Sequence, residues 1–127
     1  MMKKKTTISK LEWEIMNHIW SKTEKVSVRN VLNDLYPDNE KAYTTVQTVM
    51  NTLVSKNVLQ KEKIGLVNFY IPTLEKNMIV KSEMESLIKQ LFSGSTFSMA
   101  NFLLNEGNLS DEEIKKLRNL INKRQVE

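Results

Sequence analysis

Residues 42 to 56 read AYTTVQTVMNTLVSK, and this stretch decides the fold that the sequence predicts. Its apolar residues recur at spacings of three and four, which indicates an amphipathic helix with one buried stripe: Val46, Val49, Met50, Leu53 and Val54. The opposite face carries uncharged hydrogen-bonding side chains and no acidic group. Exposed helix faces in soluble proteins usually mix Glu with Lys. This face, flanked by Lys41 and Lys56, therefore suits either a plain solvated surface or contact with the edges of DNA bases.

Two further helices are predicted before this polar helix. Ser9 and Glu12 have the spacing of a capping box, which opens the first helix. Ser27 caps a shorter second helix, which ends before Pro37 because the residue preceding a proline disfavours helical geometry. A turn at residues 37–39 then leads into the polar helix. Two helices joined by a short turn, the second polar on its outer side, form a helix-turn-helix.

A β-hairpin is predicted directly after the polar helix. Its arms, residues 58–63 and 67–71, flank a turn at Gly65. On the second arm the apolar residues alternate toward one face: Val67, Phe69 and Ile71. On the first arm Lys61 and Lys63 point to the other face. The hairpin is either a plain cover over the core or, as its position favours, a wing that contacts phosphate, which makes residues 1–72 a winged helix-turn-helix DNA-binding domain.

Residues 73–127 have a different composition and predict three amphipathic helices. Three helices of this length cannot bury all of their apolar faces against one another. We therefore expect a dimerisation module, with packing back onto the first domain as the alternative. The residues expected in the dimer interface are Met78, Met84, Leu87, Leu91, Phe97, Leu103, Leu104, Ile114, Leu117 and Ile121. The fold class is thus mainly α: a winged helix-turn-helix domain followed by a three-helix dimerisation module.

The charge distribution supports binding to a polyanion. Residues 1–72 hold ten Lys and one Arg against seven acids, a net charge of +4, whereas residues 73–127 hold six Lys and two Arg against eight acids, a net charge of zero. With no Cys and one His, neither a metal site nor a cofactor is expected, and the single His has no nucleophile pattern that would indicate an enzyme. No apolar run approaches the roughly 20 residues that span a bilayer, so we expect a cytoplasmic protein without membrane insertion.

These segments resemble the penicillinase repressors, a family that includes the beta-lactamase and methicillin-resistance repressors and copper-responsive relatives. The resemblance covers nearly the whole chain. It is carried by ISKLEWEIM at residues 8–16 with Ile19-Trp20, by YTTVQT at 43–48 continuing to Leu53, by Phe69-Tyr70 before Pro72, and by residues 109–117.

The resemblance implies a homodimeric transcriptional repressor that binds an inverted-repeat operator in double-stranded DNA. It further implies relief by proteolysis: in resistance-type members a membrane sensor leads to cleavage of an Asn-Phe bond in the dimerisation domain. Asn101-Phe102 lies at the matching place, so a sensor-linked protease is an implied partner. The copper-responsive relatives carry cysteines near the carboxyl end; this chain has none, and copper sensing is not carried over.

Two departures from the family pattern concern DNA recognition. Family members often have basic residues where this chain has Gln47 and Thr52, and usually Gly where Asn57 stands. The first departure should remove phosphate or guanine contacts and change the preferred operator.

The expected DNA contacts follow from this arrangement. The base-contacting residues are Thr44, Gln47, Thr48 and Asn51, and the phosphate-contacting residues are Lys41, Tyr43, Lys56, Lys61 and Lys63. Gln47 and Asn51 could each hold an adenine through two hydrogen bonds. Two alternatives stay open: a winged-helix regulator released by a small-molecule inducer, and a helical protein-interaction module without specific DNA binding.

Overall fold

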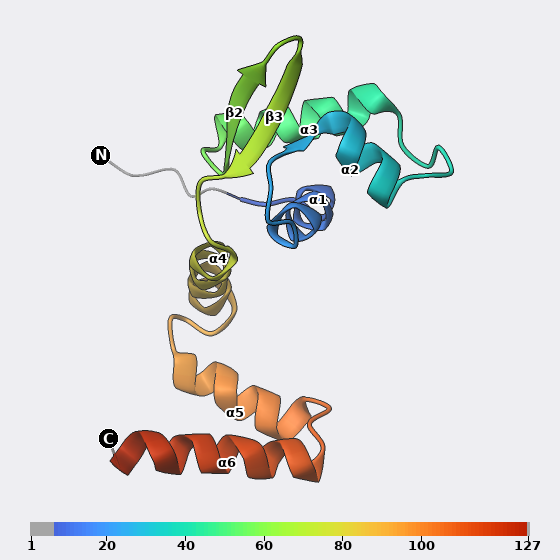
Figure 1. The fold of residues 1–127 in the computed structure, drawn as a ribbon. Coiled ribbons are helices and arrows are strands. Elements are labelled where there is room, and N and C mark those ends of the chain that lie inside the picture. Colours follow the sequence, from blue (N-terminus) through green and yellow to red (C-terminus); the bar gives the residue numbers. More distant parts are fainter. Residues whose placement is uncertain (1–6, 127) are drawn as a thin grey trace, which may run out of the picture. The chain divides into compact units, whose positions relative to one another are not determined.

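The computed structural model describes residues 7–126, which form two compact units, the first ending at Lys81 and the second beginning at Ser82. Both are mainly helical, and the first also contains a small sheet (Figure 1). The expectation of a mainly α fold with a winged-helix domain is confirmed. Along the chain the elements are α1 (Lys10–Trp20), β1 (Val26–Ser27), α2 (Val28–Leu35), α3 (Tyr43–Ser55), β2 (Leu59–Ile64), β3 (Val67–Pro72), α4 (Lys76–Leu91), α5 (Thr96–Glu106) and α6 (Asp111–Val126).

Local hydrogen bonds set where several helices begin and end. The Ser9 hydroxyl accepts a hydrogen bond from the Glu12 N–H at 3.2 Å, and the Glu12 carboxylate accepts one from the Ser9 N–H at 2.7 Å. Ser27 and Ser110 cap α2 and α6 in the same reciprocal way. Asn57 follows α3 in the left-handed region, with φ 62°. The caps predicted from the sequence at Ser9 and Ser27 are confirmed.

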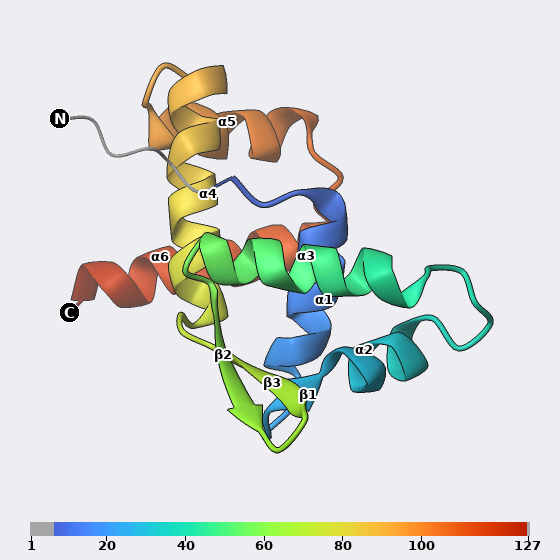
Figure 2. The ribbon, with the colours of Figure 1, turned by 90° about the horizontal axis from the view of Figure 1, so that it is seen from above.

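The core of the first unit lies between α1, α2, α3 and the sheet. Figure 2 shows α3 crossing α1, with the hairpin beside it. The predicted stripe of α3 is confirmed at Val46, Met50 and Leu53, whereas Val49 and Val54 lie half-buried at its edges. Residues from the other elements complete the fully buried set: Ile15, Met16, Ile19, Val31, Val58, Leu59 and Tyr70.

The sheet has three antiparallel strands in the order β1-β3-β2. β2 and β3 form the predicted hairpin, in which Lys61 lies opposite Tyr70 and Lys63 lies opposite Asn68. β1 contains only Val26 and Ser27. A strand of two residues leaves no alternating pattern, which is why the sequence does not predict it.

The alternation along β3 is confirmed, but its apolar face is not the face that meets the core. Val67 and Ile71 stay 46% and 37% exposed, whereas Tyr70 is 1% exposed. Residues directly opposite each other in antiparallel strands point to the same face of the sheet. Lys61 therefore shares the face of Tyr70, which packs against α3.

The first unit extends beyond residue 72, where the sequence places the domain boundary. The indole N–H of Trp20 donates to the Leu74 carbonyl at 3.0 Å, and Ile79 in α4 is buried in the core. These contacts hold the start of α4 in the first unit, which continues as far as Lys81.

The second unit has little interior of its own. Of residues 80–124, whose side chains the structure describes, none is buried. An apolar groove of about 770 Å³ runs between α5 and α6. The residues predicted for the dimer interface are exposed, apart from the half-buried Ile114: Met78, Met84, Leu87, Leu91, Phe97, Leu103, Leu104, Leu117 and Ile121.

Candidate nucleic-acid interface

The four residues predicted to read bases lie along one side of α3. Thr44, Gln47, Thr48 and Asn51 are three, one and three residues apart, which places them on one helical face. Thr44 and Thr48 are exposed and Gln47 is half-buried. α3 contains no acidic residue. The side of the first unit formed by α3 and the hairpin (Figures 1 and 2) is therefore the candidate surface for DNA.

Asn51 is held by the hairpin. The Tyr70 hydroxyl donates to Asn51 Oδ1 at 2.9 Å, and Lys61 Nζ donates to the same oxygen at 3.4 Å. Burial, and then the nearby Tyr43, raise the pKa of Tyr70, so its hydroxyl keeps its proton and remains a donor at neutral pH. An adenine held through two hydrogen bonds needs the amide oxygen as well as the amide N–H. With that oxygen engaged, only Nδ2 of Asn51 remains to face DNA.

Lys56 is engaged on the opposite flank of α3. Its ammonium group donates to Glu12 Oε1 at 2.8 Å and to the Thr7 carbonyl at 2.6 Å. Glu12 is 4% exposed. Burial alone would raise the pKa of Glu12, but the hydrogen bonds from Lys56 and Ser9 outweigh it and hold that pKa below its ordinary value of 4.5. Lys56 thus joins the end of α3 to the start of α1, and this geometry does not support its predicted role as a phosphate contact.

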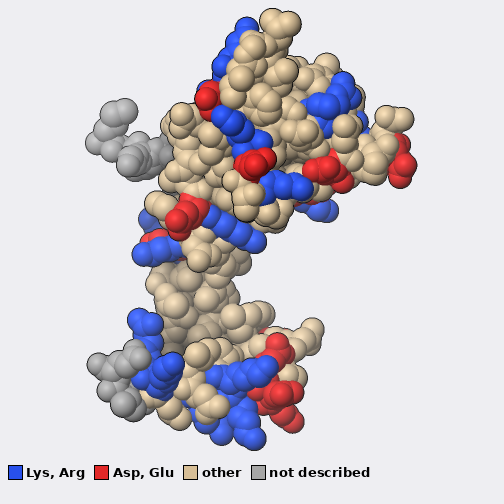
Figure 3. Space-filling model, in the orientation of Figure 1, with Lys and Arg blue, Asp and Glu red and all other residues tan. Residues whose placement is uncertain are grey.

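The remaining predicted phosphate contacts surround the polar face of α3. Lys41 precedes the helix and Tyr43 is its first residue, while Lys61 and Lys63 extend from the hairpin. All four are exposed. On the face drawn in Figure 3, Lys and Arg atoms border the hairpin. The surface therefore offers cations at both margins of the uncharged helix face, as phosphate contacts flanking a groove require.

Arg29 is a candidate that the sequence reasoning missed. It lies in the first turn of α2, and its guanidinium carbon is 4.9 Å from the centroid of the Tyr43 ring. This is within the range of a cation–π contact. The available signal was that Arg29 is the one arginine among residues 1–72. Its place beside Tyr43 depends on how α2 packs on α3, which no local pattern gives.

The proposed cleavage site lies inside α5. Asn101 Oδ1 accepts a hydrogen bond from Asn105 Nδ2 at 2.8 Å, and the Phe102 ring packs against Phe92 with centroids 5.9 Å apart. The Asn101–Phe102 peptide bond is therefore in helical geometry, one turn from each end of α5 or more.

Two further site classes find no support in the described residues. Across residues 7–126 no three His, Asp or Glu side chains gather as a metal site. Every helix of the same stretch is too short or too polar to cross a membrane.

Comparison with known proteins gives consistent findings. The family model described as "Penicillinase repressor" matches residues 8–123. The penicillinase repressor of Bacillus licheniformis is 31% identical over 121 residues, covering 94% of this chain and 93% of the relative. The penicillinase repressor of Staphylococcus aureus is 28% identical over 123 residues, covering 96% of each. The solution structure of the DNA-binding domain of the repressor BlaI matches with a TM-score of 0.51 and 31% identity, over 59% of this chain and 90% of that one.

Proposed function

The chain belongs to the penicillinase repressor family and is a DNA-binding transcriptional repressor, and from this premise we propose that it binds an inverted-repeat operator as a homodimer. The observation that supports this most is the acid-free face of α3 beside the lysine-bearing face of the hairpin. Such a helix enters the major groove while cations at its margins hold the backbone. The protein represses by occupying promoter DNA in the cytoplasm, as a binding protein without catalysis.

Base reading falls mainly to the amino-terminal half of α3. Gln47 holds an adenine through both atoms of its amide, and the methyl groups of Thr44 and Thr48 contact thymine. Asn51 contributes one donor, its Nδ2, while its oxygen stays with Tyr70. Lys41, Tyr43, Lys61 and Lys63 contact phosphates and fix the register of the helix in the groove.

The second unit supports the dimer. Its apolar side chains lack cover: Phe97, for example, is 79% exposed. A second copy that packs against α4, α5 and α6 gives these side chains an interior. A dimer presents two α3 helices about 34 Å apart, one turn of DNA, so the operator is an inverted repeat.

Relief of repression follows from cutting the second unit at Asn101–Phe102 by a sensor-linked protease. Cleavage removes the apolar surface that joins two weak half-site binders. The loss of this tethering lowers operator affinity on the order of 100-fold or more. A stable fragment ending at Asn101 under inducing conditions supports this route, and induction with intact protein favours a small-molecule inducer instead.

Selection of bound DNA from a random pool tests the proposal. We expect an inverted repeat whose half-sites are one helical turn apart, bound by two copies of the chain. Three lysines per protomer alone predict a slope of log affinity against log salt of about −5 for the dimer, and each further phosphate contact per protomer makes the slope steeper by about 2. Enrichment of no sequence, or a slope near zero, would overturn the proposal.

A further inference from the structure

We propose that a pocket between α2, α3 and the turn of the hairpin receives one backbone phosphate of the operator, with Arg29 as its cationic donor. The inference rests on the proposed function, since it assigns a further contact to the same DNA. Nothing in the sequence motif of the polar helix points to this pocket, because its cation lies on α2.

The pocket has a volume of about 290 Å³ and is lined by residues of β1, α2, α3 and β3 and of the hairpin turn. Its lining contains no acidic residue, and its polar members are Ser27, Arg29, Tyr43, Gln47, Asn68 and Tyr70, of which Tyr70 already donates to Asn51. A concavity with one cation, several neutral donors and no carboxylate suits an anion.

The guanidinium of Arg29 is prepared for this role. Its guanidinium carbon lies over the Tyr43 ring, 4.9 Å from the ring centroid, which is within the range of a cation–π contact. In the described part of the chain no carboxylate forms an ion pair with it. A stacked arginine is ordered before binding, so less freedom is lost when its fork of donors meets phosphate oxygens.

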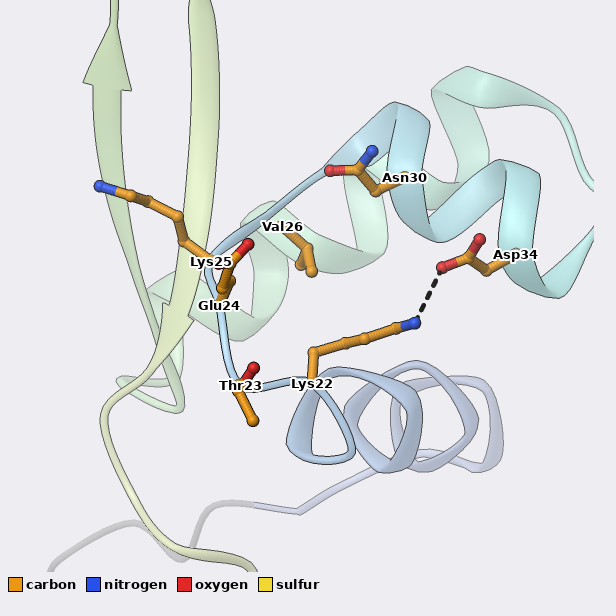
Figure 4. A pocket seen from close by; sticks show the side chains of 7 residues that line it. All are labelled: Lys22, Thr23, Glu24, Lys25, Val26, Asn30 and Asp34. Atoms are coloured by element: carbon orange, nitrogen blue, oxygen red, sulfur yellow. Dashed lines mark ion pairs between the residues drawn. The ribbon is translucent and has the colours of Figure 1, made fainter.

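A second pocket of similar size shows what distinguishes this one. It measures about 270 Å³ and is lined by the loop between α1 and β1, by Val26 of β1 and by α2 (Figure 4). Its Lys22 pairs with Asp34 at 3.4 Å, and its Lys25 pairs with Glu62 at 3.2 Å. Glu24 adds another carboxylate to the lining. Cations are present there but neutralised, so that pocket does not suit an anion and provides a matched control.

The position of the pocket connects phosphate binding to base reading. Gln47 lines it and also belongs to the base-reading face of α3. Leu66, at the turn of the hairpin, lines it too and is 95% exposed, which offers an apolar contact for deoxyribose. A phosphate held by Arg29 thereby fixes how far α3 enters the groove beside Gln47. Arg29 is thus a positioning residue for recognition.

The first test measures salt dependence with Arg29→Gln, Arg29→Lys and the control Lys22→Gln on the selected operator. Arg29→Gln should weaken operator binding about tenfold per half-site. It should reduce the magnitude of the dimer's salt slope by about 2, one contact per half-site. Arg29→Lys should keep the slope and lose part of the affinity, because lysine lacks the stacked fork. Lys22→Gln should change neither.

The second test replaces each backbone phosphate in turn by an uncharged methylphosphonate. The wild-type protein should lose affinity at one position per half-site where Arg29→Gln shows no further loss. The same interference pattern in both proteins, or an unchanged slope, overturns the pocket assignment while operator binding stands. If the wild-type protein selects no operator, the proposed function itself fails, and the two outcomes are thereby distinguished.

Discussion

At the scale of single residues, Lys56 shows how a cation beside a recognition helix can serve the fold. Replacing Lys56 by Met leaves the buried carboxylate of Glu12 without its cation. The free energy of unfolding should fall by about 2 kcal/mol, measured by urea denaturation. The salt slope of operator binding should not change. Lys61→Met is the matched control and should give a shallower salt slope with near-normal stability. A shallower slope and unchanged stability for Lys56→Met would instead make Lys56 a phosphate contact.

The same ion pair makes stability depend on pH. The pKa of Glu12 in the folded protein lies below its ordinary value of 4.5, because Lys56 and Ser9 outweigh the effect of burial. Its contribution is therefore present above pH 4.5 and is lost as the pH falls through the lower folded-state pKa. Wild-type stability should decline over this acidic range more steeply than that of Glu12→Gln. Asp34, whose pKa is lowered by His18, titrates in both proteins and cancels in the difference. Parallel curves would contradict the assignment.

Tyr70 limits what Asn51 could offer to DNA in the proposed complex. Tyr70→Phe removes the hydroxyl that donates to Asn51 Oδ1 at 2.9 Å. Only the longer 3.4 Å contact from Lys61 then remains on this oxygen, so Asn51 can hold adenine through both amide atoms, and selection from a random pool should show adenine enriched at one position per half-site. Asn51→Ala should relax preference at that position, whereas Lys61→Ala should weaken all sequences alike. An unchanged consensus with Tyr70→Phe would show that the hydrogen bond has no bearing on reading.

Local signals were predictable at this scale and long-range partners were not. Ser9 and Glu12 are three residues apart, so their capping box could be predicted from spacing. The partner of Asn51 is Tyr70, 19 residues away, and Glu12 is 44 residues from Lys56. Only the packing of α1, α3 and the hairpin brings these groups together. The sequence alone therefore predicts that the side chains of Asn51 and Lys56 are available to contact DNA.

At the scale of elements, the helical state of α5 protects the bond proposed to be cut. Proteases bind extended backbone, so α5 must open locally before Asn101–Phe102 can be cleaved. The Ser95 hydroxyl caps this helix by accepting from the Ser98 N–H at 3.0 Å.

Ser95→Ala should therefore expose the bond more often. Loss of an N-cap costs about 1 kcal/mol, which raises the open population about fivefold. Thermolysin, which cuts on the amino side of bulky apolar residues, should cleave Asn101–Phe102 correspondingly faster, followed by the masses of the fragments. Ser9→Ala removes the cap of α1 and should leave this rate unchanged. Equal rates in all three proteins would mean that α5 does not limit access.

The elements themselves were predictable in proportion to their length and pattern. The buried stripe and polar face of α3 identify it as a helix, and alternation identifies β3 as a strand. Alternation does not say which face meets the core. One large residue, Tyr70, fills the space beside α3, and three smaller apolar residues of β3 remain on the outer face: Val67, Phe69 and Ile71.

At the scale of the whole molecule, the proposed dimer depends on the groove between α5 and α6. Leu104→Asp places a charge in that apolar groove and should shift the protein to monomers, seen by sedimentation. Affinity for the inverted repeat should fall about 100-fold while affinity for an isolated half-site stays the same. Asn119→Asp adds the same charge to an exposed polar position of α6 and should have no such effect. A dimeric Leu104→Asp protein would place the interface elsewhere.

Residues 80–124 include no buried side chain, so in the proposed dimer each copy depends on a second copy for an interior. Proteolysis of some copies lowers the concentration of chains available for pairing. Unpaired copies, whose helices open more readily, are then cleaved faster. If the chain dimerises and is cleaved as proposed, each loss speeds the next, and promoter occupancy falls more steeply than the number of intact molecules. A second unit without buried side chains of its own would in this way convert gradual proteolysis into an abrupt loss of repression.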